Sequence, residues 1–264
     1  MMIAQQLYEG VNVKGEGTVG LVSYIRTDSF RISDEAYAAA VDYIKDAYGE
    51  EFVNPERIVY KSKGKTQDAH EAIRPSDINR TPSEIKDSLS RDQFRLYQLI
   101  WKRFTASRMA NAVYETTTVN ISAGDYNFHV STSRLAFEGF MSVYVEADEE
   151  KAGKQAVLKF MDENTKLTLE ELDPKQHFTQ PPAHYTEASL VKALEELGIG
   201  RPSTYSPTIT TIIARRYIAK EQKNLYVTEI GEVVNNIMKE SFPTIVDENF
   251  TANMESLLDG VAEG

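Results

Sequence analysis

The run of residues 22–29 places a tyrosine and an arginine close together, ahead of a polar turn. Tyr24 ends a short apolar stretch, and Arg26 follows two residues later. On an extended strand, residues i and i+2 lie on one face, so both side chains would face the same phosphate. A phenol can serve as a covalent nucleophile, and a guanidinium can hold phosphate oxygens. One hypothesis is a DNA-cutting enzyme in which Asp28 helps to order the site. The alternatives are an ordinary tyrosine, a surface ion pair for Arg26 and a turn cap for Asp28.

Arg201, Ser203 and Thr204 form a second candidate site, at a tight turn that leads into a predicted helix. Backbone amides and hydroxyl groups at a helix N-terminus suit a phosphate group. These residues are therefore candidates for contacts to a nucleic-acid strand. The alternative is that they only cap the helix.

Residues 1–110 are expected to form a mainly helical segment around Tyr24. Residues 19–25 alternate in polarity and predict a short buried strand. A helix is predicted to begin after Ser33, which is a typical N-cap, and to end at Gly49. A second long helix is predicted over residues 92–109. Its apolar positions are Leu96, Leu99, Ile100, Trp101 and Phe104.

Residues 111–175 are expected to form a β-rich segment that offers no catalytic group. The β-branched run 116–121, the turn at 124–125 and the run 126–130 predict a hairpin. Three further pieces are predicted: strands over 140–145 and 166–172, and an exposed acidic loop over 147–153.

Residues 176–264 are expected to return to helices. A helix capped by Thr186 should end at Gly198, and a second should begin at Ser203 or Thr204. A hairpin and another helix are then predicted over residues 217–228 and 229–240. Helix, turn, helix and hairpin is the order of a winged-helix unit.

The composition restricts the chemistry that this chain can perform. The chain has 264 residues, no cysteine and four histidines. Disulfides, thiolate metal sites and thiol catalysis are therefore excluded, and the histidines have no metal-ligand spacing. Neither a transmembrane run nor a secretory signal is evident, which fits a cytoplasmic protein.

A net charge of −11 argues at first against DNA binding, because phosphate contacts dominate nucleic-acid affinity. The acidic excess nevertheless lies outside residues 1–110, where basic and acidic side chains balance. A single-strand groove can also be built from a few arginines, backbone amides and stacking aromatic rings.

Several spaced motifs together resemble the type IA DNA topoisomerases, in the form found in bacterial topoisomerase I. The first is Tyr24-Ile25-Arg26-Thr27-Asp28-Ser29, and the second includes Ala69-His70-Glu71-Ala72-Ile73-Arg74-Pro75-Ser76. The other matching segments are residues 96–104, 181–182, 185–190, 198–205 and 250–255. The order and spacing agree over nearly the whole chain. Val22-Ser23 and Ile25 stand where the family often has Ile-Thr and Met, and these exchanges keep the polarity pattern.

The resemblance implies an isomerase that needs no ATP and relaxes negatively supercoiled DNA. In the family, the tyrosine at the position of Tyr24 cuts one strand through a 5′-phosphotyrosyl link. The resemblance gives Arg26 a phosphate-binding role, places His70 near the active site and the DNA, and makes Arg74 a residue that orders this region. Read without the resemblance, His70 would be a hydrogen-bonded structural residue, and Arg74 would pair with Glu71 or Asp77.

The resemblance also implies an α+β multidomain core in three parts. These are a helical tyrosine domain over residues 1–110, an antiparallel β hinge over 111–175 and a winged-helix-like DNA-binding segment over 176–264. The family's Toprim domain, which holds magnesium through an Asp-x-Asp pair, has no counterpart here. We therefore expect a fragment that binds no metal itself, acts with the Toprim domain of the same full-length chain and is inactive alone. The expected partners are single-stranded and negatively supercoiled DNA, without a membrane. The topoisomerase half of a reverse gyrase and a non-catalytic DNA-binding module are the alternatives.

Overall fold

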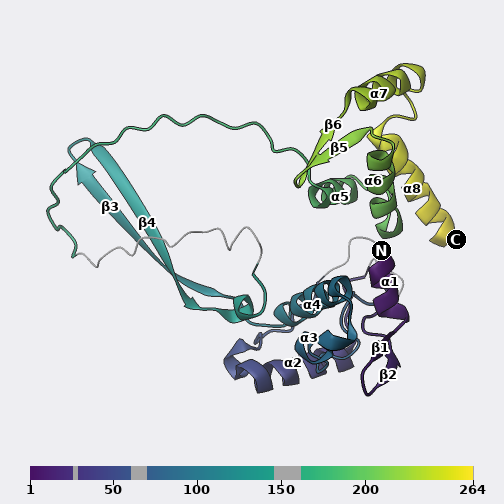
Figure 1. Ribbon diagram of the computed structural model, residues 1–264. Coiled ribbons are helices and arrows are strands. Elements are labelled where there is room, and N and C mark those ends of the chain that lie inside the picture. Colours follow the sequence, from purple (N-terminus) through teal and green to yellow (C-terminus); the bar gives the residue numbers. More distant parts are fainter. Residues whose placement is uncertain (26–28, 61–69, 146–161, 264) are drawn as a thin grey trace. The chain divides into compact units, whose positions relative to one another are not determined.

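The computed structural model describes residues 1–25, 29–60, 70–145 and 162–263 (Figure 1). The described residues form an α+β fold in which helices accompany three two-stranded antiparallel sheets. The chain divides into two compact units, unit 1 over Met1–Glu170 and unit 2 over Glu171–Gly264. The division into three functional segments remains a prediction.

Unit 1 combines short and long helices with two hairpins. Its helices are α1 (Met2–Glu9), α2 (Asp34–Tyr48), α3 (Pro82–Ile85) and α4 (Arg91–Ala106), with 3-10 turns η1 (Glu50–Phe52), η2 (Lys86–Ser88) and η3 (Gly139–Ser142). Its strands are β1 (Val11–Val13), β2 (Gly17–Val19), β3 (Val113–Ala123) and β4 (Tyr126–Phe137).

The predicted ends of α2 are confirmed. The Ser33 side chain accepts a hydrogen bond from the Ala36 backbone N–H at 3.3 Å, and Gly49 stops the helix with a φ of 115°. Helix α4 also starts from a serine cap, because Ser90 accepts a bond from the Gln93 N–H while the Gln93 side chain returns to the Ser90 N–H. Both helices are therefore delimited by local hydrogen bonds that the sequence encodes.

Helix α4 supplies the centre of the core in unit 1. Tyr97, Trp101 and Phe104 are buried, whereas Leu99 is 48% exposed and does not belong to the buried face. The Trp101 indole N–H donates to the Ile78 carbonyl at 2.8 Å, and the Tyr97 hydroxyl donates to the Arg80 carbonyl at 2.6 Å. These two bonds fix the chain that follows the second motif against α4. The other buried apolar residues of this core are Leu7, Val13, Leu21, Val22, Ile25, Ala40, Ile44, Ile78, Ile85, Met109 and Val143.

The prediction of a strand over residues 19–25 is wrong. Strand β2 ends at Val19, and beyond it only an isolated bridge joins Val22 to Pro75. Leu21 and Val22 are adjacent and both buried, so the burial of this segment does not follow the alternation of a strand. Residues 26–28 lie outside the described residues.

The predicted β3–β4 hairpin is confirmed, with Val119 opposite Val130 and Ile121 opposite Phe128. Figure 1 shows β3 and β4 as two long arrows side by side, which form a two-stranded ribbon. The predicted strand over residues 140–145 is wrong: Gly139 turns the chain at a φ of 50°, and a 3-10 turn follows. Residues 166–172 form no strand either, since no described strand pairs with them. The predicted acidic loop at 147–153 lies outside the described residues.

Unit 2 contains the predicted succession of helices and a hairpin (Figure 1). Its elements are α5 (Glu187–Glu196), α6 (Pro202–Ala214), β5 (Ile218–Glu221), β6 (Asn224–Val227), α7 (Glu229–Ser241) and α8 (Glu248–Glu263). Thr186 caps α5 as predicted, and an isolated bridge joins it to Asn224 of β6. The predicted cap of α6 at Ser203 or Thr204 is wrong, because the helix begins earlier. Arg201 holds the N-cap position and Pro202 is the first helical residue. Proline suits a first helical position, where no N–H bond is needed.

Among the helices described here, none combines the length and apolar character needed to cross a membrane.

Candidate active site

Tyr24 reaches the surface from a segment that is otherwise anchored in the core. Leu21, Val22 and Ile25 are buried, while Tyr24 is 42% exposed. The apolar neighbours hold the backbone, and the phenol ring between them remains accessible. This combination suits a nucleophile that must stay fixed while it meets a large substrate.

The two motifs singled out in the sequence lie side by side. The Ser23 backbone N–H donates to the Arg74 carbonyl at 2.9 Å. The Ser23 hydroxyl donates to the Ala72 carbonyl at 2.8 Å and accepts from the Arg74 N–H at 2.9 Å. Ser23 thus links the tyrosine segment to the second motif through both its backbone and its side chain. Ser23 is a polar residue in an apolar run, directly before Tyr24. Sequence analysis did not use this signal of a side-chain hydrogen bond.

The ring of Tyr24 contacts two other aromatic rings. The Tyr8 ring meets it edge-on, with centroids 5.5 Å apart and planes at 68°. The His70 ring lies on the second motif, 5.7 Å from the Tyr24 ring and tilted by 40°. The structure therefore brings together the predicted pair Tyr24 and His70, and adds Tyr8 to it.

Helix α1 presents Tyr8 to the site because its C-terminal end packs closely on the chain before Tyr24. The Leu21 N–H donates to the Leu7 carbonyl at 2.8 Å. A Cβ atom on Gly20 would lie only 2.8 Å from the Tyr8 carbonyl oxygen, so this approach needs a residue without a side chain. Sequence analysis missed Tyr8, since nothing in its local pattern indicates that α1 meets residues 20–21.

Arg74 makes one of its two expected ion pairs. Its Nε atom lies 2.8 Å from a Glu71 carboxylate oxygen, and Nη1 donates to the Pro75 carbonyl at 3.0 Å. Asp77 lies instead beside Arg80 at 4.0 Å. Arg26 and Asp28 fall outside the described residues, so their predicted roles remain predictions.

The candidate residues of unit 2 are engaged in helix packing. The Arg201 guanidinium lies 2.6 Å from Asp259 and 3.4 Å from Glu255, both on α8. The hydrogen bond with Asp259 raises the pKa of Arg201 above its usual value. The Thr204 hydroxyl accepts a bond from the Arg201 N–H at 2.9 Å and so closes the cap, while Ser203 is exposed. A DNA contact by Arg201 would compete with its two carboxylate partners.

Within the described parts of the chain, no three His, Asp or Glu side chains gather closely enough to hold a metal ion. That magnesium binds through the Toprim domain remains a prediction.

The described residues thus combine an α+β fold with an accessible tyrosine beside a histidine. The chain belongs to the DNA topoisomerase family, whose sequence profile matches residues 1–264. Within that family it matches the bacterial type IA enzyme topoisomerase I. It is similar to full-length topoisomerase I from Thermotoga maritima, with 37% sequence identity and a TM-score of 0.77. The match covers 100% of this chain and 42% of that one, so this chain spans less than half of that relative's length.

Proposed function

We propose that this chain carries the nucleophile of a type IA DNA topoisomerase that relaxes negatively supercoiled DNA. One strand is cut transiently, the other strand passes, and the cut is resealed. The observation that carries the proposal is the exposed Tyr24 ring, in contact with Tyr8 and His70 on a buried backbone. A cytoplasmic location and an ATP-independent reaction belong to the same proposal.

The chemistry follows from the properties of a phenol. The Tyr24 oxygen attacks a phosphodiester, an O–P bond to the tyrosine forms, and the bond from phosphorus to the 3′ oxygen breaks. The phenol proton ends on the released 3′-hydroxyl. A phenol has a pKa of about 10, well below that of an alcohol, so phenolate leaves readily when the 3′-hydroxyl attacks in return. The phosphotyrosyl link thus preserves the bond energy needed for resealing.

Charge develops on the phosphoryl oxygens during both transfers, and fixed cations stabilise it. Arg26 is our proposed cation on this chain. His70 lies beside Tyr24, and we propose that it contacts the DNA backbone next to the attacked phosphate. Arg74, through Glu71 and Pro75, is proposed to keep the segment that carries His70 in place.

Magnesium is proposed to bind through the Toprim domain of the same full-length protein. When bound, it supplies positive charge for the phosphoryl oxygens and for DNA binding. The proposed part of this chain in the reaction is to hold and orient the nucleophile.

The purified 264-residue chain is expected not to relax negatively supercoiled plasmid DNA, because it supplies the nucleophile without the metal-binding domain. Addition of a separately purified Toprim-containing fragment of a bacterial topoisomerase I, with magnesium, should restore covalent cleavage. Gel electrophoresis of the plasmid and denaturing gels of labelled single strands measure the two activities. Relaxation by the chain alone, reproduced in the absence of any host topoisomerase, would show that the chain is catalytically sufficient.

Replacement of Tyr8 by leucine should slow formation of the covalent adduct in the reconstituted enzyme. An edge-on aromatic pair contributes roughly 0.5–1.5 kcal/mol, so the expected loss is about threefold to tenfold. The variant Tyr8→Phe keeps the ring and should retain the wild-type rate. Single-turnover cleavage at saturating DNA separates this effect from binding. Equal rates for Tyr8→Leu and Tyr8→Phe would contradict a positioning role.

A further inference from the structure

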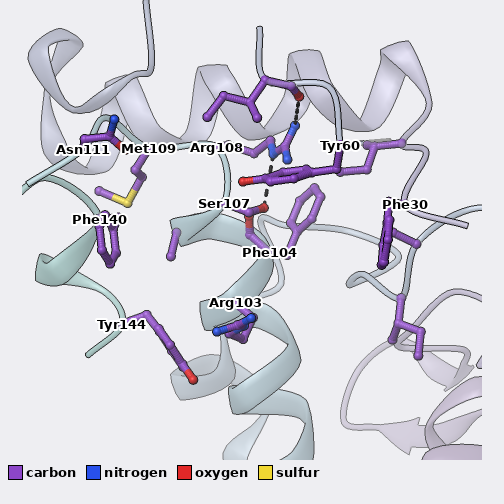
Figure 2. Close-up of a pocket in the computed structure, with 15 residues that line it drawn as sticks. Phe30, Tyr60, Arg103, Phe104, Ser107, Arg108, Met109, Asn111, Phe140 and Tyr144 are labelled. Carbon is purple, nitrogen blue, oxygen red and sulfur yellow. Dashed lines mark hydrogen bonds between the residues drawn. The ribbon is translucent and has the colours of Figure 1, made fainter. Parts of the chain in front are cut away.

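A cavity of about 570 Å³ in unit 1 has a lining unlike the rest of this acidic chain. Its aromatic residues are Phe30, Tyr60, Phe104, Phe140 and Tyr144. Among the residues that the structure describes, its charged members are two arginines, Arg103 and Arg108, and no described aspartate or glutamate lines it. Figure 2 shows the labelled arginines and aromatic side chains around this space. A cavity of this size accommodates a small organic ligand.

Arg108 is the unusual member of this lining. It is only 5% exposed, and its Nη1 and Nε atoms donate to the Ile58 carbonyl at 3.1 Å and the Ser107 hydroxyl at 3.2 Å. Its Nη2 atom is buried and has no hydrogen-bond partner among the described residues. Burial lowers the pKa of Arg108 below its usual value. The described residues give Arg108 no carboxylate partner, and a buried charge without a counter-charge is unfavourable, so an anion in this cavity would improve the electrostatics.

The aromatic side chains around the two arginines provide stacking surfaces. The Arg108 guanidinium lies 5.3 Å from the Tyr60 ring centroid, as Figure 2 illustrates, and Arg103 lies 5.0 Å from that of Tyr144. Phe30 and Tyr60 are about half exposed, and large apolar rings at an open cavity are suited to contact with a ligand. Cations next to accessible rings form a combination that binds both a phosphate and a base.

The cavity is lined in part by residues of the chain segments that carry the candidate active site. Phe30 follows the tyrosine motif in sequence, and Ala72 and Ile73 belong to the motif that carries His70. The Ala72 N–H donates to the Arg31 carbonyl at 2.8 Å and joins the two segments. A DNA strand attached to Tyr24 would therefore meet segments that also form this cavity.

We propose that this cavity binds one nucleotide of the DNA strand, with the base against Phe30 and Tyr60 and the phosphate drawn to Arg103 and Arg108. The proposal rests on the proposed function, because the strand is the one that Tyr24 cleaves. A free nucleotide has the same chemistry and is the other possible source of the ligand.

The experiment measures binding of a fluorescent oligothymidylate to the 264-residue chain by anisotropy, and binding of thymidine monophosphate by competition. Arg108→Gln keeps a donor for the Ile58 carbonyl and removes the charge. It should weaken oligonucleotide binding about tenfold and lower the slope of log K against log salt by about one. Arg134→Gln removes an equal charge from the exposed β3–β4 ribbon, outside the cavity, and is the matched control.

A second variant keeps the proposal testable if Arg108→Gln fails to fold. Tyr60→Leu changes a half-exposed ring and should also weaken binding about tenfold, the loss of one base stack. The matched control is Tyr126→Leu, an exposed ring on the ribbon. Thermal unfolding of each variant verifies the fold.

The proposal is supported if both cavity variants bind the oligonucleotide more weakly while the controls do not, and if thymidine monophosphate displaces the oligonucleotide. Unchanged binding in both cavity variants overturns it. Loss of mononucleotide binding alone, with oligonucleotide binding intact, overturns DNA as the source. Covalent cleavage by the reconstituted wild-type enzyme is measured in parallel: if it fails while the cavity variants still lose binding, the proposed function fails and the nucleotide site stands.

Discussion

Replacement of Tyr24 by phenylalanine is expected to abolish the covalent DNA adduct of the reconstituted enzyme. Phenylalanine keeps the ring that packs against Tyr8 and His70 at 5.5 and 5.7 Å, so the local structure should persist. It lacks the oxygen that attacks phosphorus, and no other atom of that ring can replace it. The measurement is radiolabel transfer from single-stranded DNA to protein on a denaturing gel, followed by mapping of the modified peptide.

Binding and folding provide the controls for this experiment. Tyr24→Phe should bind single-stranded DNA as the wild type does and unfold at a similar temperature, while Tyr8→Phe should still form the adduct. An adduct that persists in Tyr24→Phe and maps to another residue would place the nucleophile elsewhere. The experiment thereby separates the role of Tyr24 from that of its aromatic neighbour.

The second large effect is expected at Trp101. This side chain is 5% exposed, meets the Tyr43 ring edge-on at 5.5 Å and donates to the Ile78 carbonyl. Trp101→Ala would leave a large cavity, and substitutions of this kind cost about 3–5 kcal/mol. It would also leave the Ile78 carbonyl without its donor. Denaturant unfolding followed by far-UV circular dichroism measures the loss.

Leu99 lies on the same helix and gives a matched control. Because it is 48% exposed, Leu99→Ala should change the free energy of unfolding by no more than about 0.5 kcal/mol. The comparison tests the burial pattern of α4 directly. A similar loss in both variants would mean that the exposed and buried faces of this helix are wrongly assigned.

Local signals predicted the ends of several helices well. Ser33, Gly49 and Thr186 act where the sequence indicates, because a cap depends on hydrogen bonds within one turn. The β3–β4 hairpin was equally predictable, since a short turn sets its register. The start of α6 was harder to predict, because Pro202 allows the helix to begin before Ser203 and Thr204, the hydroxyl residues that resemble a cap.

The wrong strand predictions have a common physical cause. Residues 19–25, 140–145 and 166–172 have strand-like composition, but a strand also needs a partner with which to exchange hydrogen bonds. Val22 finds only an isolated bridge to Pro75, and Phe140 enters a 3-10 turn after Gly139. Whether such a partner exists depends on distant parts of the chain.

The sequence by itself determined the family motifs and the caps of the main helices, and it supplied the proposal that Tyr24 is the nucleophile, because these depend on residue identity and short spacing. Only the tertiary structure decided that Tyr8 and His70 both contact Tyr24, that Ser23 joins the two motifs, and that Arg108 is buried beside a cavity. Those relations join residues far apart in the chain, and the packing of α1, α4 and the second motif creates them.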